Sequence, residues 1–236
     1  NKHEILNLDW LLRKYMKSEQ FNKNTTETIK SQTQMINRIN NYPRGQDKIL
    51  GTAELKIITS GVLRRYSDSR AKTSPVSANR EISLISVAWN WALERDLIIF
   101  INPCTNVKRN KESARTRYVT EQEYQSAYLL AEKYPYLQPA MELAYLCRMR
   151  RCEILGATRK QILSDGFDTL RAKGSRDAIT LWSPRLRKAV KANHTVAGIY
   201  IIKDEKGQRI TESAFKSAWT RLKKLMVTNG IEPFNF

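Results

Sequence analysis

The N-terminal half of the chain shows helical periodicity interrupted by short polar breaks. Ile29, Ile36 and Ile39 fall on one face of a predicted helix, and Asn24 with Glu27 in front of them is typical of a capping box. A break that contains proline and glycine follows, and it ends this helix at about residue 41.

The clearest helix of this half is predicted over residues 77–96. Ile82, Ile85, Trp89 and Ala92 recur there at intervals of three and four, which gives one continuous apolar stripe. A shorter apolar stripe precedes this helix, and beside it runs a cationic stripe that contains Arg64, Arg65, Arg70 and Lys72.

The C-terminal half mixes helical and strand patterns. Thr120 and Glu123 form a second capping box in front of a helix, and Ser183 followed by Pro184 marks the start of another. Further helices are predicted over 137–146 and 211–229, and strands over 167–172, 177–182 and 198–202, the first two joined by a glycine-containing hairpin turn at 173–176. The predicted fold class is therefore mainly α with a small antiparallel β-sheet, that is, α+β.

The two halves are separated by residues 102–117, where the helical periodicity is lost. This segment contains Pro103 and a basic run made of Lys108, Arg109, Lys111, Arg115 and Arg117. We predict a helical domain over residues 1–107, a basic interdomain linker over 108–117 and a second domain over 118–236.

Charge narrows the range of partners. The chain has 41 Lys and Arg residues against 23 Asp and Glu residues, which gives a net charge of +18. Nucleic acid is the first candidate, because Lys and Arg laid on phosphates release condensed counterions. We expect the face with Arg64 and Arg65, and the linker residues Lys108 and Arg109, to lie against phosphates. A merely solvated charged loop explains the spacing of the linker residues equally well.

A membrane-surface protein is the competing class for so basic a chain. The longest apolar run, Leu97–Ile101, is too short to span a bilayer, and no secretory signal is visible. The three cysteines and two histidines show no paired ligand spacing, so we expect no zinc site and no other metal. Their pattern fits reduced thiols in a cytoplasmic protein.

The segment Ala144–Ile162, which reads AYLCRMRRCEILGATRKQI, carries the most specific pattern. It resembles the first catalytic-arginine box of the phage integrase family, the tyrosine recombinases, whose pattern is roughly T-G-x-R-x-x-E-[IL]-x-x-L. The match makes Arg150 the catalytic arginine and Glu153 the carboxylate that orients it. A bidentate guanidinium suits a phosphodiester that gains negative charge as it becomes five-coordinate. Cys147 and Arg148 depart from the Thr and Gly that are frequent in the family.

Two further parts of the C-terminal half bear on DNA. Arg148 and Arg151 either add phosphate contacts or are solvated neighbours of the catalytic arginine. The segment TLRAKGSRDAITLW resembles the family's β-hairpin, which delivers a catalytic lysine at its turn, and Lys173 matches that lysine. An ammonium on a flexible stem can protonate the departing 5′ oxygen. Arg176, in the same turn, is a further expected DNA contact.

The N-terminal half supports the same resemblance. Asn79 and Arg80 are similar to the asparagine–arginine pair that opens a helix of the family's core-binding domain, and Asn102 with Pro103 is similar to the end of that domain. Family members clamp duplex DNA between this SAM-like helical bundle and the catalytic domain, which makes Arg80 a phosphate contact. The resemblance covers about residues 50–236.

The resemblance implies a site-specific DNA recombinase of a phage, prophage or other mobile element. A tyrosine attacks the phosphodiester, a 3′-phosphotyrosyl link conserves the bond energy, and a 5′ hydroxyl reverses the step during integration or excision. No cofactor is implied. The implied partners are double-stranded DNA at attachment sites, further copies in a homotetramer when the chain is full length, and accessory DNA-bending proteins. The implied location is the cytoplasm of a bacterial host, at the nucleoid.

Part of the family's site is missing from the sequence. The family completes it with an H-x-x-R box, a further His or Trp and a nucleophilic tyrosine, but His194 is followed by Thr195, Val196 and Ala197 and fails that pattern. We expect a catalytic domain truncated at Phe236, and none of the ten tyrosines present is offered as the nucleophile. The alternatives are a non-catalytic DNA-binding protein derived from an integrase and a basic helical DNA-binding regulator.

Overall fold

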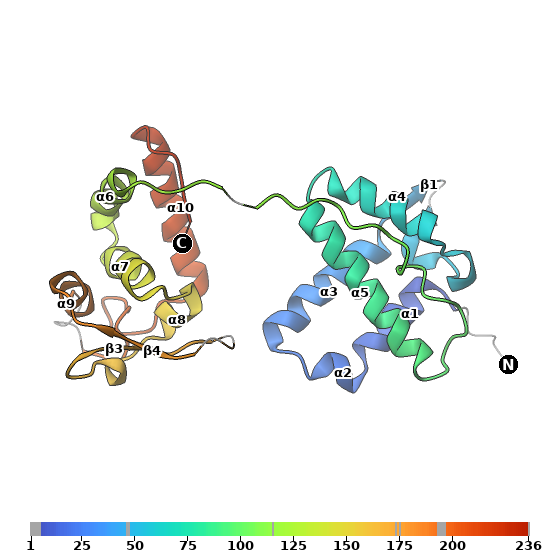
Figure 1. The fold of residues 1–236 in the computed structure, drawn as a ribbon, viewed down its shortest axis with the longest axis horizontal. Coiled ribbons are helices and arrows are strands. Elements are labelled where there is room, and N and C mark those ends of the chain that lie inside the picture. The colour runs from blue at the N-terminus through green and yellow to red at the C-terminus, as the bar shows by residue number, and fades with distance from the viewer. Residues whose placement is uncertain are drawn as a thin grey trace. The chain divides into compact units, whose positions relative to one another are not determined.

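The computed structural model describes residues 6–45, 48–114, 116–172, 174, 176–192 and 197–235. The chain divides into two compact units, Asn1–Arg115 and Thr116–Phe236, each with its own hydrophobic core. Helices dominate both units, and the strands form short antiparallel pairs (Figure 1). The predicted class, mainly α with a small antiparallel component, is confirmed.

The N-terminal unit is built around one long helix. Its elements are α1 (Leu8–Met16), α2 (Glu19–Asn22), α3 (Thr26–Asn40), the antiparallel strands β1 (Pro43–Gly45) and β2 (Lys48–Ile49), α4 (Ser60–Ala71) and α5 (Pro75–Leu93), with 3₁₀ turns at Leu50–Thr52 and Leu55–Ile57. Helix α5 packs against α1, α3 and α4. The β1–β2 ribbon is an element that the sequence patterns did not predict.

The apolar stripe predicted for α5 forms the middle of this core. Ile82, Ile85, Trp89 and Ala92 are all buried. The helix begins two residues earlier than predicted, because the Ser74 side chain accepts a hydrogen bond from the Ser77 backbone and proline fits the first helical position. It ends at Leu93 rather than at residue 96, which has a left-handed backbone with φ of 51°.

The cap predicted for α3 is displaced by one residue. Thr25, not Asn24, is the N-cap, and its side chain accepts from the backbone of Thr28. The Asn24 side chain instead donates to the Phe21 carbonyl (2.8 Å), at the end of the preceding helix. Asn24 is therefore bonded to the end of α2, and the adjacent threonine caps α3.

The stretch from Asn102 to Val107, just before the predicted linker, packs against the N-terminal unit. The Asn102 side chain donates to Ser86 Oγ (2.9 Å) and Asn90 Oδ1 (2.7 Å), both on α5. Cys104 and Val107 are buried in the core. These two apolar side chains and the asparagine amide hold the backbone of this stretch against α5.

The C-terminal unit contains five helices and one hairpin among its described residues. They are α6 (Glu121–Leu130), α7 (Leu137–Cys147), α8 (Arg151–Gly156), β3 (Gly166–Thr169), β4 (Ala178–Leu181), α9 (Pro184–Lys191) and α10 (Glu212–Thr228), with 3₁₀ turns at Ala131–Lys133 and Arg159–Gln161. The Thr120–Glu123 capping box is present, and Ser183 caps α9 by accepting from the backbone of Leu186. Both predicted helix starts are therefore confirmed.

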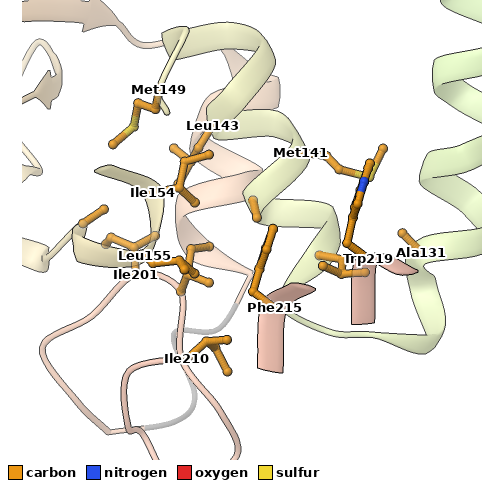
Figure 2. Close-up of a cluster of buried hydrophobic side chains, with 14 of the residues drawn as sticks. Ala131, Met141, Leu143, Met149, Ile154, Leu155, Ile201, Ile210, Phe215 and Trp219 are labelled. Carbon is orange, nitrogen blue, oxygen red and sulfur yellow. The ribbon is translucent and has the colours of Figure 1, made fainter. Parts of the chain in front are cut away.

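The core of this unit lies between α7, α8 and α10. Figure 2 shows Leu143 and Ile154 next to each other, with Phe215 of α10 beside the same core. Met149 is also buried, immediately before α8. The buried side chains on either side of residue 150 fix the backbone of the α7–α8 junction.

The predicted hairpin is present with shorter strands. Gly166 pairs with Leu181 and Thr169 with Ala178, so the ladder stops before residues 170–172. The third predicted strand, 198–202, is not formed in the described residues 197–202, where Tyr200 makes an isolated bridge with Thr158. Glycine at 198 adopts φ of 136°, which bends the backbone out of a strand conformation.

Candidate active site

Arg150 lies at the junction of α7 and α8. It is the N-cap of α8, with extended backbone angles, and not a residue of the helix itself. Arg150 and Glu153 therefore do not both lie within the helix, because α8 begins at Arg151. The two residues still meet, since Arg150 Nη1 lies 2.9 Å from Glu153 Oε1. The Arg150 side chain is 45% exposed, so part of its guanidinium faces solvent.

Glu153 is the anchor of the site. Its side chain is 1% exposed. It accepts hydrogen bonds from the backbone N–H of Arg150 (2.8 Å) and of Ala172 (2.9 Å), besides those from two guanidinium groups. Burial alone would raise the pKa of Glu153, but the backbone N–H groups of Ala172 and Arg150 and the Arg150 guanidinium outweigh it and lower this pKa to about 2. The carboxylate is therefore charged at neutral pH.

The second guanidinium belongs to Arg171, which sequence reasoning missed. Its Nη2 donates to the Cys147 carbonyl (2.9 Å), and its Nη1 donates to the Arg148 carbonyl (2.7 Å) and lies 3.4 Å from Glu153 Oε2. Its side chain is 14% exposed. No local motif marks Arg171, because its partners lie 18 to 24 residues earlier in the sequence.

The other two arginines of the box have different surroundings. Arg148 is exposed and closes α7 in a left-handed conformation, with φ of 52°. This conformation favours glycine and costs a residue with a side chain about 1–2 kcal/mol, which agrees with the glycine that is frequent at this place in the family. Arg151 points toward α10, where Nη2 lies 3.1 Å from Glu212 Oε2. The structure brings neither side chain to Glu153.

The predicted hairpin residues are described in part. Lys173 lies outside the described residues. Gly174 has φ of 61°, and Arg176 is exposed. The base of the turn is closed by Asp177, whose Oδ1 accepts from the Arg171 backbone N–H (2.7 Å).

The predicted DNA contacts of the N-terminal unit differ in exposure. Arg65 on α4 and Arg80 on α5 are exposed. Arg64 pairs with Asp68, with 2.6 Å between Nη2 and Oδ1, and its Nη1 donates to the Lys108 carbonyl. Arg64 therefore holds residues 108–112, called the basic segment below, to α4.

The basic segment is also held from α5. Lys108 and Arg109 have exposed side chains, and Arg109 Nη1 donates to the Asn79 carbonyl (3.2 Å). The buried Asn79 side chain accepts from the Asn110 backbone N–H (2.8 Å) and donates to Glu112 Oε1 (2.7 Å). Asn79 is thus a bracket between α5 and residues 109–112, a role that its place beside Arg80 did not indicate.

One member of the predicted cationic stripe, Arg70, is paired with a buried carboxylate. Arg70 donates from Nε to Oε2 of the fully buried Glu81 (3.0 Å), which also accepts from Arg38 Nε and from the Tyr66 hydroxyl. Burial raises the pKa of Glu81, and the hydrogen bonds from Arg70, Tyr66 and Arg38 overcome this and lower it. Assigning Arg70 to a DNA-facing stripe was wrong, because this buried carboxylate requires a cation.

Two tyrosines are hydrogen-bonded to buried carboxylates. The Tyr66 hydroxyl donates to Glu81 (2.7 Å), and the Tyr124 hydroxyl donates to Glu142 (2.8 Å). Burial and the neighbouring carboxylate raise the pKa of both phenols. Neither phenol is therefore suited to act as a nucleophile at neutral pH.

Two further kinds of feature, a metal site and a membrane span, are not found in the described part of the chain. It contains no group of three or more His, Cys, Asp or Glu side chains placed to hold a metal ion. None of its helices has the length and apolar character needed to cross a membrane.

Comparison with known proteins finds similarity at the level of structure. No family model and no curated protein sequence matches the chain. Among solved structures, a lambda integrase dimer bound to a COC′ core site has a TM-score of 0.77 at 20% identity, and the match covers 92% of this chain and 80% of that one. A lambda integrase tetramer bound to a Holliday junction has a TM-score of 0.78 at 19% identity, with 97% and 67% covered.

A second integrase gives the same result. The Tn1549 transposon integrase in complex with circular intermediate DNA has a TM-score of 0.74 at 14% identity, with 98% of this chain and 81% of that one covered. Lambda and Tn1549 integrases are tyrosine recombinases. Over nearly its whole length, the chain therefore has the fold of these tyrosine recombinases.

Proposed function

We propose that the chain is the DNA-clamping and phosphate-binding part of a tyrosine-type site-specific DNA recombinase. The observation that carries this proposal is the Arg150–Glu153 pair. A half-exposed guanidinium is fixed at the head of α8 by a buried, charged carboxylate. The integrase fold of both units supports the same assignment.

The proposed chemistry is a transesterification. A tyrosine oxygen forms a bond to phosphorus, the bond from phosphorus to the 5′ oxygen breaks, and the departing oxygen takes a proton. Arg150 binds the non-bridging oxygens as they gain charge, and Glu153 keeps its guanidinium aimed. Lys173, at the hairpin turn, is the proposed donor of the proton. The reverse step uses a 5′ hydroxyl as the nucleophile.

The proposed substrate is double-stranded DNA, and the assembly on DNA is a homotetramer. The net charge of +18 and the exposed Arg65, Arg80, Lys108 and Arg109 support DNA binding. The similar integrases were solved on DNA, as a dimer on a core site and as a tetramer on a Holliday junction. Accessory DNA-bending proteins and a place in the bacterial nucleoid belong to the same proposal.

Replacing Arg150 with alanine in the complete protein tests this function. A nicked duplex that traps the covalent intermediate serves as the substrate, and the protein–DNA adduct is measured. We expect Arg150→Ala to lower the rate of adduct formation by about 10²–10³-fold, the usual loss when one transition-state donor is removed. DNA affinity should change little, since the remaining basic residues provide most of the phosphate contacts.

Arg44→Ala is the matched control, because Arg44 is exposed on β1 of the N-terminal unit. It should leave the adduct rate unchanged. Normal adduct formation by Arg150→Ala would refute the role of Arg150. DNA binding by the wild-type protein without any adduct would favour a non-catalytic DNA-binding protein instead.

A further inference from the structure

Arg171 has no part in the proposed chemistry, yet its side chain bonds to three separate groups of the site. It lies between strand β3 and the hairpin turn. One guanidinium contacts three groups: the carbonyls of Cys147 and Arg148 at the end of α7, and the carboxylate of Glu153 on α8. Arg171 therefore joins the hairpin to both helices that flank Arg150.

The carbonyls explain why this position favours an arginine. The last carbonyls of a helix have no partner within the helix, and the negative end of the helix dipole attracts a cation. Arg148 has left-handed backbone angles, so α7 ends abruptly there. A planar guanidinium with several fixed donors can reach two carbonyls and one carboxylate together, whereas an ammonium is a single point charge.

The backbone next to Arg171 is attached to the same carboxylate. The Ala172 N–H donates to Glu153 Oε1 (2.9 Å), and the Arg171 N–H donates to Asp177 Oδ1 (2.7 Å) across the base of the turn. Lys173 is the next residue after Ala172, and consecutive Cα atoms lie about 3.8 Å apart. Ala172, the residue that precedes Lys173 in the sequence, is therefore held next to the Arg150–Glu153 pair.

We propose that Arg171 is a positioning residue that attaches the lysine-bearing hairpin to the Arg150–Glu153 pair, so that both cations reach one phosphate. This inference rests on the proposed recombinase function. Arg171 itself is not expected to touch DNA, since its side chain is nearly buried and its donors are used internally. Replacing Arg171 should therefore have the effect of misplacing the proton donor, and not the effect of removing a phosphate contact.

Substrates with two different leaving groups distinguish a misplaced proton donor from a lost phosphate contact. In one duplex the scissile 5′ atom is oxygen, and in the other it is sulfur. A thiol has a pKa of about 8.5, far below that of an alcohol, so a thiolate leaves without being protonated. The variants Arg171→Met and Arg171→Lys would be made in the complete protein, with Lys173→Ala and Arg150→Ala as references, and adduct formation would be measured at saturating DNA.

We expect Arg171→Met to slow adduct formation on the oxygen substrate by roughly 10–100-fold, within the range that misplacing a catalytic group costs. The sulfur substrate should restore most of this loss, as it should for Lys173→Ala but not for Arg150→Ala. Arg171→Lys should lie between wild type and Arg171→Met. Lys160→Ala, an exposed residue of the same unit, should match wild type on both substrates.

Two results would overturn the inference: full activity of Arg171→Met on the oxygen substrate, or an equal loss on both substrates. Thermal unfolding of each variant identifies a folding defect, and Asp177→Asn then provides an independent test, because it weakens the base of the turn without removing Arg171. The inference predicts a smaller loss for Asp177→Asn that sulfur again restores. If wild type forms no adduct with either substrate, the proposed function itself fails.

Discussion

A charged carboxylate enclosed by protein donors is the residue-scale feature on which the site depends. Glu153 accepts from Arg150, Arg171 and Ala172 and has a pKa of about 2. Because this pKa lies below the value near 4.3 of an unfolded chain, the ionised carboxylate stabilises the fold above about pH 4.3. That contribution is lost as the pH falls toward 2.

Glu153→Gln should therefore destabilise the protein most at neutral pH. The amide keeps the size of the side chain but cannot accept from every donor, and buried donors left unpaired cost about 1–3 kcal/mol. Urea unfolding measures this difference at pH 7 and at pH 3. The difference between wild type and Glu153→Gln should shrink at the lower pH, and a difference that stays constant or grows would contradict the role of the charge.

Sequence and structure agree at the residue scale where the interaction is local. The contact between Arg150 and Glu153 was predicted because three residues of separation place them together, and the motif names both. Arg171 and Asn79 were not recognised as brackets, since each contacts backbone groups more than fifteen residues away. The patterns of charge and polarity along the chain do not encode which carbonyl a guanidinium reaches.

At the scale of elements, helices were predicted more accurately than strands. Ser183–Pro184 and the Thr120–Glu123 box were reliable because a capping interaction lies within four residues. The strand expected over 198–202 failed because a short apolar run does not specify a pairing partner, and Gly198 turns the backbone away. Hairpin β3–β4 succeeded because its two strands are close neighbours in the sequence.

The hairpin depends on a glycine at its first pair. A Cβ on Gly166 would lie 2.5 Å from the Thr180 carbonyl oxygen and 2.6 Å from Ile179 Cγ2. Gly166→Ala must therefore push the two strands apart, and we expect a loss of about 1–3 kcal/mol, typical of overpacking. Thermal or urea unfolding measures the change.

Gly61→Ala is the matched control for this substitution. Gly61 lies in α4, and the nearest atoms to its added Cβ are 3.7 Å away. Alanine is favoured over glycine within a helix by roughly 0.8–1.0 kcal/mol, so this variant should be as stable as wild type or more stable. A Gly166→Ala protein as stable as the Gly61→Ala protein would mean that the hairpin tolerates a wider separation of its strands.

At the scale of the whole molecule, two units are joined by a segment that is largely attached to the first of them. Asn79 and Arg64 hold residues 108–112, and Ser67 accepts from the Asn110 side chain (2.7 Å). On the other side, Arg117 pairs with Glu123 and Glu232 in the second unit. These contacts hold the chain as far as Glu112 in the first unit and from Arg117 onward in the second.

Asn79→Ala should release the attached segment without removing a phosphate contact. We expect the duplex DNA affinity to fall roughly two- to fivefold, in line with the length dependence of a flexible connection. The slope of log affinity against log salt should stay unchanged, because no cation is lost. Fluorescence anisotropy at several salt concentrations measures both quantities, and the circular dichroism of the variant verifies its fold.

Arg80→Ala provides the contrast from the neighbouring position. Arg80 is exposed beside Asn79, and loss of a phosphate contact there should reduce the salt slope by about 1. If Asn79→Ala also reduces the slope, then Asn79 affects DNA contacts directly. If it changes neither affinity nor slope, the bracket has no influence on how the two units engage DNA together.

The bracket at Asn79 also has a kinetic consequence. In the proposed complex with DNA, the short connection would keep the second unit at a high effective concentration near the duplex that the first unit has bound. A unit that dissociates would therefore rebind before the other unit dissociates. The whole protein would leave DNA only when both units are dissociated at the same moment. A buried asparagine that touches no nucleotide would in this way lengthen the lifetime of the complex.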